Sequence, residues 1–353
     1  MKKLSRVMAG VLALGLCAFA AGCSTTENVS SQSSVIKKVS DAPVKAGFEP
    51  LTEIKEGRKN VYAVLKVMKG GYWSEVVNGL KAGGEAAGCN VYVGGALREM
   101  DWQTQKELLD ELKDKKADAV ILAPSDSMQL IPAAKELQDK KVPLIVVDTP
   151  LNSTDYTAGY MTHNFEAGEK AAEEMLRLLR ASGLKGTEKV TVAVKASSLN
   201  SQNINERVSG VISYWNGNAP ANWKLAEKTL VDFGDSALSK KLGEDAIKDI
   251  ADLKGFIGCN NSSTVAAAEA IKESNRKDLT LVGFDYAKET AAMIADEKLN
   301  AAAVVQNQYA MAYNGVQAAV DAANGKKLEQ NVYNDVKVIN IDNYKAFEAE
   351  VKK

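Results

Sequence analysis

The stretch Pro143-Leu-Ile-Val-Val-Asp-Thr-Pro150 decides the fold, because it is a short apolar run that ends in polar residues. A continuous apolar run of this length is typical of a strand that is buried on both faces of a sheet. The stretch Leu279-Thr-Leu-Val-Gly-Phe-Asp285 repeats this form in the second half of the chain. The two stretches therefore predict buried parallel strands in two separate regions.

Around these stretches, apolar runs alternate with amphipathic segments from residue 59 onward. The first run is 61–67, and the pattern starts again at residue 164, where apolar residues are spaced by four. Strands that alternate with helices predict parallel sheets covered by helices on both faces. The expected strands are 61–67, 90–93, 119–123, 143–148, 158–162, 190–194, 223–230, 256–259 and 279–285, and the expected helices are 74–88, 103–112, 128–138, 164–181 and 207–215.

The composition narrows the classes of function. The length of 353 residues predicts about two domains. A balance of 44 Lys and Arg against 45 Asp and Glu excludes binding of nucleic acid through a broad basic surface. A single His disfavours metal sites and Ser-His-Asp catalysis, and no glycine-rich phosphate motif is present. No enzyme activity, metal or cofactor is expected, and Cys89 and Cys259 are expected to be buried free thiols in different lobes.

Residues 1–22 have the parts of an export signal. A basic start, residues 2–6, precedes an uncharged apolar stretch and then the small residues 20–22 before Cys23. This pattern resembles a bacterial lipoprotein signal, in which the Cys sulfur receives a diacylglycerol and the chain is cut before it. The resemblance implies an extracytoplasmic protein that is anchored to the membrane through Cys23, with an ordinary secretory signal as the alternative. Residues 23–58 are expected to form a flexible tether because they begin with a Ser-, Thr- and Asn-rich stretch.

Polar and aromatic side chains recur where the predicted strands end. Ligands of parallel α/β sheets lie beyond the carboxyl ends of the strands. Aromatic faces together with carboxylates and amides suit a polyhydroxylated ligand such as a sugar. The candidate ligand-binding residues are Tyr72, Trp73, Asp148, Asn203, Arg207, Phe233, Asn260, Asp285 and Gln306.

In their order and spacing, these segments resemble the periplasmic binding proteins of the ribose/galactose type, which are the solute receptors of ABC importers. The resemblance covers about residues 59–345. It is strongest at Tyr72-Trp73, at the stretch ending in Asp148, and at Glu-Arg207-x-x-Gly, Val-Gly-Phe-Asp285 and Val-Val-Gln306.

The resemblance implies the type I periplasmic binding protein fold. This fold has two doubly wound, Rossmann-like parallel-sheet α/β lobes joined by three crossover segments, expected near residues 162–163, 305–306 and 334–336. The expected N-lobe is 59–162 plus 306–334, and the expected C-lobe is 163–305 plus 335–353. His163 then lies at a crossover, where a hinge or helix-start role is expected.

The resemblance also implies roles for the candidate residues. Tyr72 and Trp73 would wall the ligand on the N-lobe side, and Phe233 on the C-lobe side. Asp148 and Arg207 would bind ligand oxygens. The remaining positions would line the cleft and the hinge, and Asn203 matches the hexose-binding branch alone; these positions are Asn203, Asn260, Asp285 and Gln306.

Three departures change the hydrogen bonds expected for ribose itself. Thr149 stands where the ribose receptors have Arg, and Ala123 where they have Asn. Gly70-Gly71 replaces Asn-Pro before the aromatic pair.

The function implied is that of a monomeric receptor that closes on a sugar or polyol by a hinge motion and delivers it to a membrane ABC permease. An alternative stays open, in which the same lobes report a sugar or autoinducer to a membrane sensor kinase. An exported enzyme on this fold is a third alternative. Asp148 and Asp285 could be catalytic carboxylates, but no nucleophile or acid stands at a recognisable spacing, which favours ligand binding.

Overall fold

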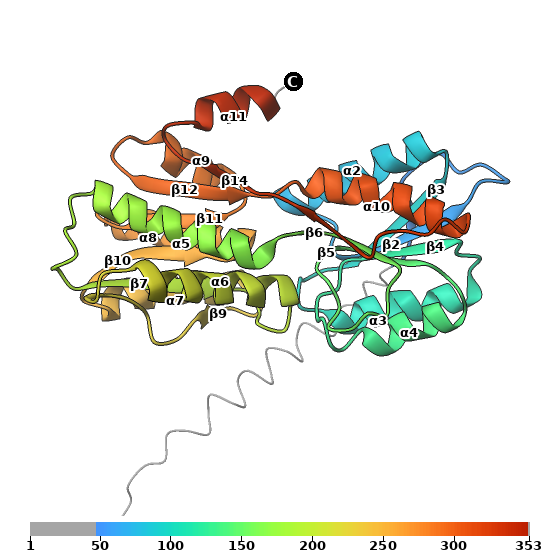
Figure 1. The fold of residues 1–353 in the computed structure, drawn as a ribbon, viewed down its shortest axis with the longest axis horizontal. Coiled ribbons are helices and arrows are strands. Elements are labelled where there is room, and N and C mark those ends of the chain that lie inside the picture. Colours follow the sequence, from blue (N-terminus) through green and yellow to red (C-terminus); the bar gives the residue numbers. More distant parts are fainter. Residues whose placement is uncertain (1–46, 352–353) are drawn as a thin grey trace, which may run out of the picture. The chain divides into compact units, whose positions relative to one another are not determined.

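A computed structural model describes residues 47–351 as two α/β lobes, each built around one central sheet (Figure 1). The export signal and Cys23 lie outside the described residues. Across residues 47–351, no helix has both the length and the apolar character needed to cross a bilayer.

The N-lobe holds a seven-stranded sheet with helices on both faces. Its elements are β1 (Glu49–Pro50), β2 (Asn60–Val67), α2 (Gly71–Ala87), β3 (Asn90–Ala96), α3 (Trp102–Glu111), η1 (Leu112–Asp114), β4 (Ala119–Leu122), α4 (Ile131–Asp139), β5 (Leu144–Asp148), β6 (Ala158–Thr162), α10 (Gln308–Ala323) and β13 (Asn331–Asn334). The strand order is β1-β3-β2-β4-β5-β6-β13, and every neighbouring pair except β1–β3 is parallel.

The C-lobe repeats this plan. Its elements are α5 (Asn164–Ala181), β7 (Val190–Ala196), α6 (Gln202–Asn218), β8 (Trp223–Leu225), β9 (Leu230–Val231), α7 (Ser236–Asp249), β10 (Leu253–Gly258), α8 (Asn261–Ser274), β11 (Thr280–Phe284), α9 (Lys288–Ala295), β12 (Asn300–Val305), β14 (Lys337–Ile339) and α11 (Tyr344–Val351). The strand order is β14-β12-β11-β10-β7-β8, with β9 also paired to β7. Only β14, at the edge, runs antiparallel to its neighbour.

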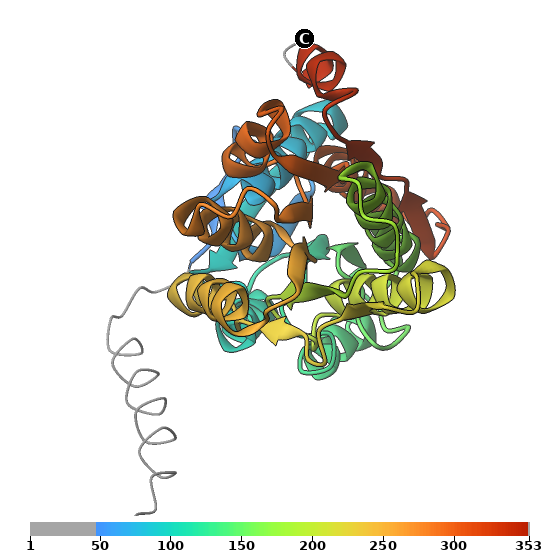
Figure 2. The same ribbon diagram turned by 90° about the vertical axis from the view of Figure 1, so that its left-hand side faces the viewer.

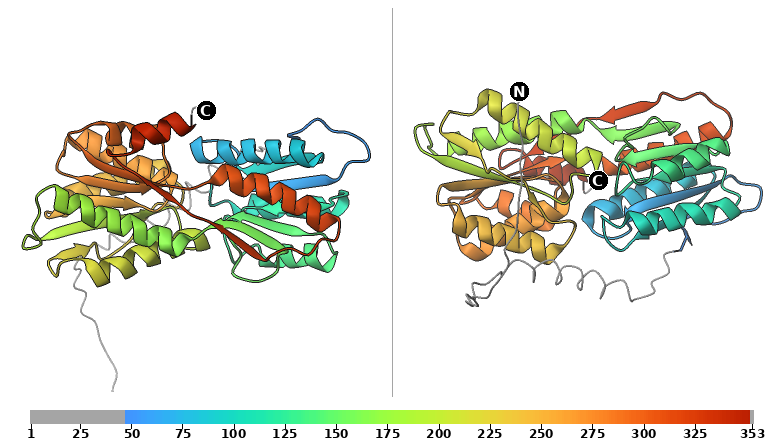
Figure 3. Two further views of the ribbon diagram at one scale, coloured as in Figure 1. Left: turned by 45° about the horizontal axis from the view of Figure 1, so that its top comes forward. Right: turned by 90° about the horizontal axis from the view of Figure 1, so that it is seen from below.

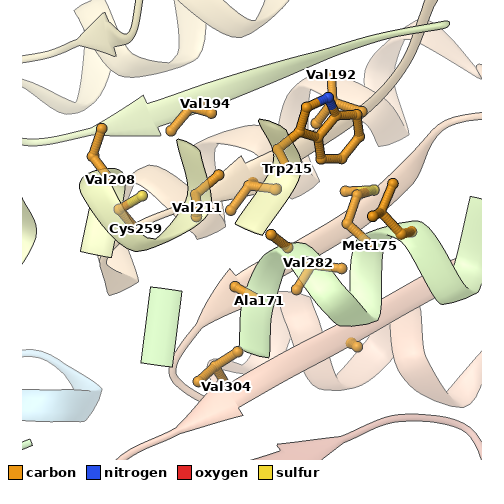
Figure 4. Packing of buried hydrophobic residues seen from close by; sticks show 14 of the residues in the cluster. Ala171, Met175, Val192, Val194, Val208, Val211, Trp215, Cys259, Val282 and Val304 are labelled. Atoms are coloured by element: carbon orange, nitrogen blue, oxygen red, sulfur yellow. The ribbon is translucent and has the colours of Figure 1, made fainter. Parts of the chain in front are cut away.

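Each sheet separates two hydrophobic cores. In the C-lobe, α5 and α6 cover one face and α7, α8 and α9 cover the other, as Figure 2 shows from the end of that lobe. Figure 4 shows the first of these cores, where Trp215 of α6 and Met175 of α5 pack on strand residues such as Val192 and Val282. Both faces of the strands are thus buried, which explains why the strand sequences are almost continuously apolar.

Polar residues at helix starts fix where several helices begin. The Asp101 carboxylate accepts a hydrogen bond from the backbone N–H of Thr104 and starts α3. Asp235 does the same for α7 through Leu238. These caps satisfy backbone donors that have no partner within the helix.

The chain crosses between the lobes three times. It passes from β6 to α5, from β12 to α10, and from β13 to β14, and Figure 3 shows the last of these segments running between the two lobes. His163 lies at the first crossover, and its ring stacks on that of Tyr333 with 4.3 Å between centroids. The predicted fold of two doubly wound lobes with three crossovers is confirmed, with antiparallel strands at two sheet edges as an addition.

Two expectations need correction. The expected tether was wrong for its last residues, because 47–58 already pack on the N-lobe. β1 pairs with β3, and the buried Thr52 hydroxyl donates to the Cys89 carbonyl and accepts from the Val91 N–H. The expected strand 223–230 is two short strands, β8 and β9, that pair with β7 one after the other.

The cysteines of both lobes behave as predicted. Cys89 and Cys259 are buried free thiols. Burial raises the pKa of Cys89 to about 11 and that of Cys259 to about 12. Both thiols therefore stay protonated and unreactive at neutral pH.

Candidate ligand site between the lobes

Side chains of both lobes converge on one small cavity at the carboxyl ends of the strands. The cavity measures about 20 Å³, which is room for about one water molecule. All but one of the predicted ligand-binding residues line it: Tyr72, Trp73, Asp148, Asn203, Arg207, Asn260, Asp285 and Gln306. The structure thus brings together residues that lie far apart in the sequence.

The aromatic pair comes from the first turn of α2. That helix begins at Gly71, earlier than the expected residue 74, so Tyr72 and Trp73 are helical. Gly70 precedes the helix with a φ of 100°, a conformation that favours glycine. The two rings meet edge to face with centroids 5.3 Å apart, and both are buried. They form an aromatic wall on the N-lobe side of the cavity.

Asp148 ends β5 and is the most heavily bonded carboxylate of the site. Its φ of 66° lies in the left-handed region, which is strained for an Asp and common at functional sites. Its oxygens accept hydrogen bonds from Tyr72 Oη (2.5 Å), Thr149 Oγ1 (2.5 Å) and, across the lobes, Asn203 Nδ2 (3.2 Å). The Lys66 ammonium lies 3.3 Å from Oδ2.

These partners keep Asp148 ionised despite its burial. Burial alone would raise the pKa of the carboxyl group. The positive charges of Lys66 and Arg207, with the hydrogen bonds from Thr149 and Tyr72, outweigh burial and hold the pKa below its ordinary value. The carboxylate is therefore charged at neutral pH.

Arg207 reaches the cavity because α5 and α6 pack very closely. A Cβ atom on Gly168 of α5 would lie 2.1 Å from the Arg207 carbonyl oxygen, and one on Gly210 of α6 would lie 2.0 Å from the Phe165 carbonyl oxygen. Any larger residue would force these helices apart. The Glu-Arg-x-x-Gly motif thus positions the arginine as well as supplying it.

Protein acceptors engage each of the three nitrogens of the Arg207 guanidinium. Its Nε donates to Asn164 Oδ1 (2.8 Å), its Nη1 to the Cys259 carbonyl (3.0 Å) and its Nη2 to Gln306 Oε1. Its central carbon lies 4.1 Å from the centroid of the Phe284 ring. These contacts hold the Arg207 guanidinium in one orientation.

Asp285 directly follows β11 and has fewer partners than Asp148. Its φ is 72°, and Gln306 Nε2 donates to Oδ1 at 2.9 Å. Burial raises its pKa to about 6; Arg207 and Gln306 act in the opposite direction, while the charges of Asp148 and Glu99 raise it further.

Two charged residues of the cavity, Lys66 and Glu99, are not among the residues predicted from the sequence. Lys66 lies inside a predicted strand, and its signal is a lone buried Lys in an otherwise apolar run. Glu99 lies in the β3–α3 loop, where no local motif marks it. Its Oε1 accepts a hydrogen bond from Trp73 Nε1 at 3.0 Å, and its Oε2 lies 3.5 Å from Asn260 Nδ2 of the C-lobe.

The structure does not bring Phe233 to this cavity. The side chain is 66% exposed, and the residue has a φ of 53°. The preceding Asp232 is buried and anchors the loop by accepting hydrogen bonds from Ser239 Oγ (2.7 Å) and Ser263 Oγ (2.8 Å). The expectation that Phe233 walls the cleft is therefore not met in this arrangement, because the anchored loop points its side chain to the surface.

No group of three or more His, Cys, Asp or Glu side chains within the described part of the chain is arranged to hold a metal ion. The cavity chemistry is that of hydrogen bonding and aromatic contact.

A family profile described as a periplasmic binding protein domain matches residues 61–327, which is most of the chain and both lobes. The chain belongs to the periplasmic binding protein family. Members of this family are extracytoplasmic binding proteins and not enzymes, as the sequence predicted for this chain.

Known relatives agree with this assignment. The ribose import binding protein of Bacillus subtilis is 23% identical over 279 residues, which cover 78% of this chain and 86% of that protein. An ABC transporter solute binding protein from Agrobacterium vitis with bound D-fucose is 25% identical, with a TM-score of 0.75 over 82% of this chain and 98% of that one. A carbohydrate transporter solute binding protein from Agrobacterium radiobacter in complex with D-arabinose has a TM-score of 0.76 at 22% identity, over 84% of this chain and 99% of that one.

Proposed function

We propose that this periplasmic binding protein captures a sugar or sugar-like polyol between its lobes and delivers it to an ABC importer. The observation that carries the proposal is that polar side chains of both lobes meet in one buried cavity. A ligand held there contacts both lobes at once, so binding and closure favour each other.

Hinge closure is part of the proposal. A cavity of about 20 Å³ is far smaller than a sugar ring, and direct contacts hold the lobes together beside it. Lys66 donates to Ser201 Oγ at 3.0 Å, and the backbone N–H of Gln202 donates to Ser127 Oγ at 3.0 Å. A ligand must therefore enter with the lobes apart and take over some of these bonds as the lobes close about the three crossovers.

The chemistry of the lining supports a polyhydroxylated ligand. Asp148, Asp285 and Arg207 supply charged hydrogen-bonding groups, and Tyr72 and Trp73 supply an aromatic wall. Ring hydroxyls pair with such groups, and the C–H faces of a sugar ring pack on aromatic rings. The relatives that carry ribose, D-fucose and D-arabinose in their names support the same class of ligand.

The proposal includes a lipid anchor on Cys23, residues 24–46 as the spacer and a monomeric receptor that docks on a membrane permease. The lipoprotein-like signal supports the anchor, and the import function named for the Bacillus subtilis relative supports the permease. Cys23→Ser should release the protein from the membrane fraction, and the mass of the wild-type protein should include a diacylglycerol. An unchanged membrane fraction with Cys23→Ser would exclude the lipid anchor.

A thermal-shift screen against pentoses, hexoses and polyols tests the binding function. Ligand binding to the folded state should add about 2.7 kcal/mol of stability at 100 times the Kd. The shift should vanish in Asp148→Asn and persist in the control Asp139→Asn, which changes an exposed carboxylate. No shift with any of these compounds would exclude a sugar as the ligand.

A further inference from the structure

We propose that the ligand of this site carries a protonated amino group, as an amino sugar or amino polyol does, and that this group is bound by Glu99, Asn260 and Asp285. The inference rests on the proposed function and names the ligand class more closely. It follows from the hydrogen-bond inventory and the charge of the cavity.

Most of the hydrogen-bond donors of the cavity already have protein acceptors. Lys66 is shared between Ser201 and Asp148, and Arg207 is bonded to three protein groups. Trp73 Nε1 donates to Glu99, and Gln306 Nε2 donates to Asp285. A ligand rich in acceptors would have to compete with every one of these bonds.

Some hydrogen-bond acceptors of the cavity, by contrast, still have no donor among the described residues. Asn260 is 6% exposed, and its Oδ1 is buried without a hydrogen-bond partner among the described residues. The amide nitrogen of Asn260 faces the Glu99 carboxylate. If the amide oxygen and nitrogen of Asn260 were exchanged, Oδ1 would face this carboxylate instead, and two acceptors would oppose each other. Glu99 therefore favours the orientation in which Oδ1 has no partner. A buried acceptor without a donor is costly, and a ligand N–H removes that cost.

Asp285 adds a second incomplete acceptor. Among the described residues its carboxylate accepts a hydrogen bond from Gln306 only and has no ion pair within 4 Å. Glu99 likewise has no Lys or Arg partner in the described part of the chain; its partners are the uncharged Trp73 and Asn260. Two carboxylates thus face the cavity without a cation of their own.

The charge of the lining points the same way. Three carboxylates, Asp148, Asp285 and Glu99, stand against two cations, Lys66 and Arg207. The Lys66 cation is already paired with Asp148. An ammonium ligand supplies three donors and the missing positive charge, whereas an anionic ligand would add to the net negative charge of the lining.

Matched pairs of compounds test the inference on the full chain, purified in mild detergent. Calorimetry compares D-glucosamine with D-glucose, D-galactosamine with D-galactose, and D-mannosamine with D-mannose at pH 6.5, a choice that keeps the amines largely protonated. In at least one pair, the amine should bind about tenfold or more tightly than its neutral partner.

Glu99→Gln identifies the group responsible. The glutamine keeps an oxygen for Trp73 Nε1 and removes the charge, so the ratio of the amine affinity to the neutral-sugar affinity should fall to about one. The control Glu107→Gln changes an exposed carboxylate and should keep the preference.

The outcomes separate this inference from the proposed function. Equal or tighter binding of the neutral member in every pair that binds, or an unchanged preference in Glu99→Gln, would overturn the amine inference and leave sugar binding in place. If no member of any pair binds, and the wider screen of sugars and polyols also fails, the proposed function falls and takes the inference with it.

Discussion

The two lobes carry the same pair of charged residues and use them differently. Each lobe has one buried lysine in the first strand of its doubly wound unit, Lys66 in β2 and Lys195 in β7, although the strand registers place Lys195 level with Val64. Asp148 and Asp285 lie at the carboxyl ends of the corresponding strands β5 and β11. Both aspartates are held in the left-handed region of φ. The backbone frame of the site is thus repeated from lobe to lobe.

The difference lies in where each lysine points. Lys66 pairs with Asp148, whereas Lys195 donates to the Ser239 carbonyl at 2.7 Å, on the α7 side of its sheet. Burial lowers the pKa of Lys195 to about 8. The N-lobe carboxylate therefore has more protein partners than the C-lobe carboxylate, which accepts one hydrogen bond within the described residues. Equivalent carboxylates in a repeated fold can thus differ in how far the protein itself fills their hydrogen-bonding capacity.

The largest effect on stability is expected when the ion pair between Lys66 and Asp148 of the N-lobe is broken. Lys66→Met leaves Asp148 buried without its nearest cation and should lower the free energy of unfolding by about 3–5 kcal/mol. Lys195→Met is the matched control, because it removes a buried lysine that has no ion pair within 4 Å in the described structure. It should change the free energy of unfolding by about 1 kcal/mol or less, since the lost hydrogen bond is offset by the relief of burying a charge. Urea unfolding measures the free energy of unfolding of both variants. Equal losses of stability in the two variants would contradict the difference proposed between the two lysines.

The second expected effect is a pH dependence of the free energy of unfolding that arises from the titration of Asp285. Its folded pKa of about 6 exceeds the ordinary value of 3.8, so the stability linked to its proton is fully present below pH 3.8 and is lost as the pH rises through 6. Burial is the largest cause of the raised pKa; Arg207 and Gln306 lower the pKa, and Asp148 and Glu99 raise it.

Asp285→Asn removes that titration. Above pH 6 the variant should be more stable than the wild type by about 3 kcal/mol, and the difference should shrink toward zero near pH 4. Urea unfolding of both proteins from pH 4 to pH 8 gives the difference directly. A difference that does not vary with pH would show that Asp285 titrates normally.

A smaller effect is expected for the contact that ties α6 to the N-lobe. Ser127 lies outside the cavity, and its Oγ accepts from the Gln202 N–H across the lobes. Ser127→Ala should weaken ligand binding about fivefold by destabilising the closed form. Ser125→Ala is the control, because the Ser125 hydroxyl is buried without a partner within the described residues, and it should leave the Kd unchanged. Equal Kd values for the two variants would exclude Ser127 as a closing contact.

The smallest effect is expected at Phe233. Its side chain is exposed and does not line the cavity, so Phe233→Ala should change the Kd by about twofold or less. Trp73→Ala, which removes part of the aromatic wall, is the comparison and should weaken binding far more. A loss at Phe233 as large as that at Trp73 would mean that this loop turns into the cleft when ligand binds.

The lobes and most of the residues that line the cavity could be predicted from the sequence for one physical reason. Buried parallel strands are continuous apolar runs, and the polar residues after them, such as Asp148 and Asp285, must lie at one edge of each sheet. The position of Glu99 depends on the path of a loop, and the exposure of Phe233 depends on how Asp232 anchors its turn. Local sequence periodicity reports neither feature. Glu99 was therefore not predicted as a cavity residue, and Phe233 was predicted in the cleft although its side chain is exposed.

The most direct test of the central claim is a crystal structure of the protein with the monosaccharide that gives the largest thermal shift. The account predicts one sugar ring beside Trp73 that hydrogen-bonds to Asp148 of the N-lobe and Asp285 of the C-lobe at the same time. A sugar that contacts one lobe alone, or that lies outside the cavity between these two aspartates, would contradict it.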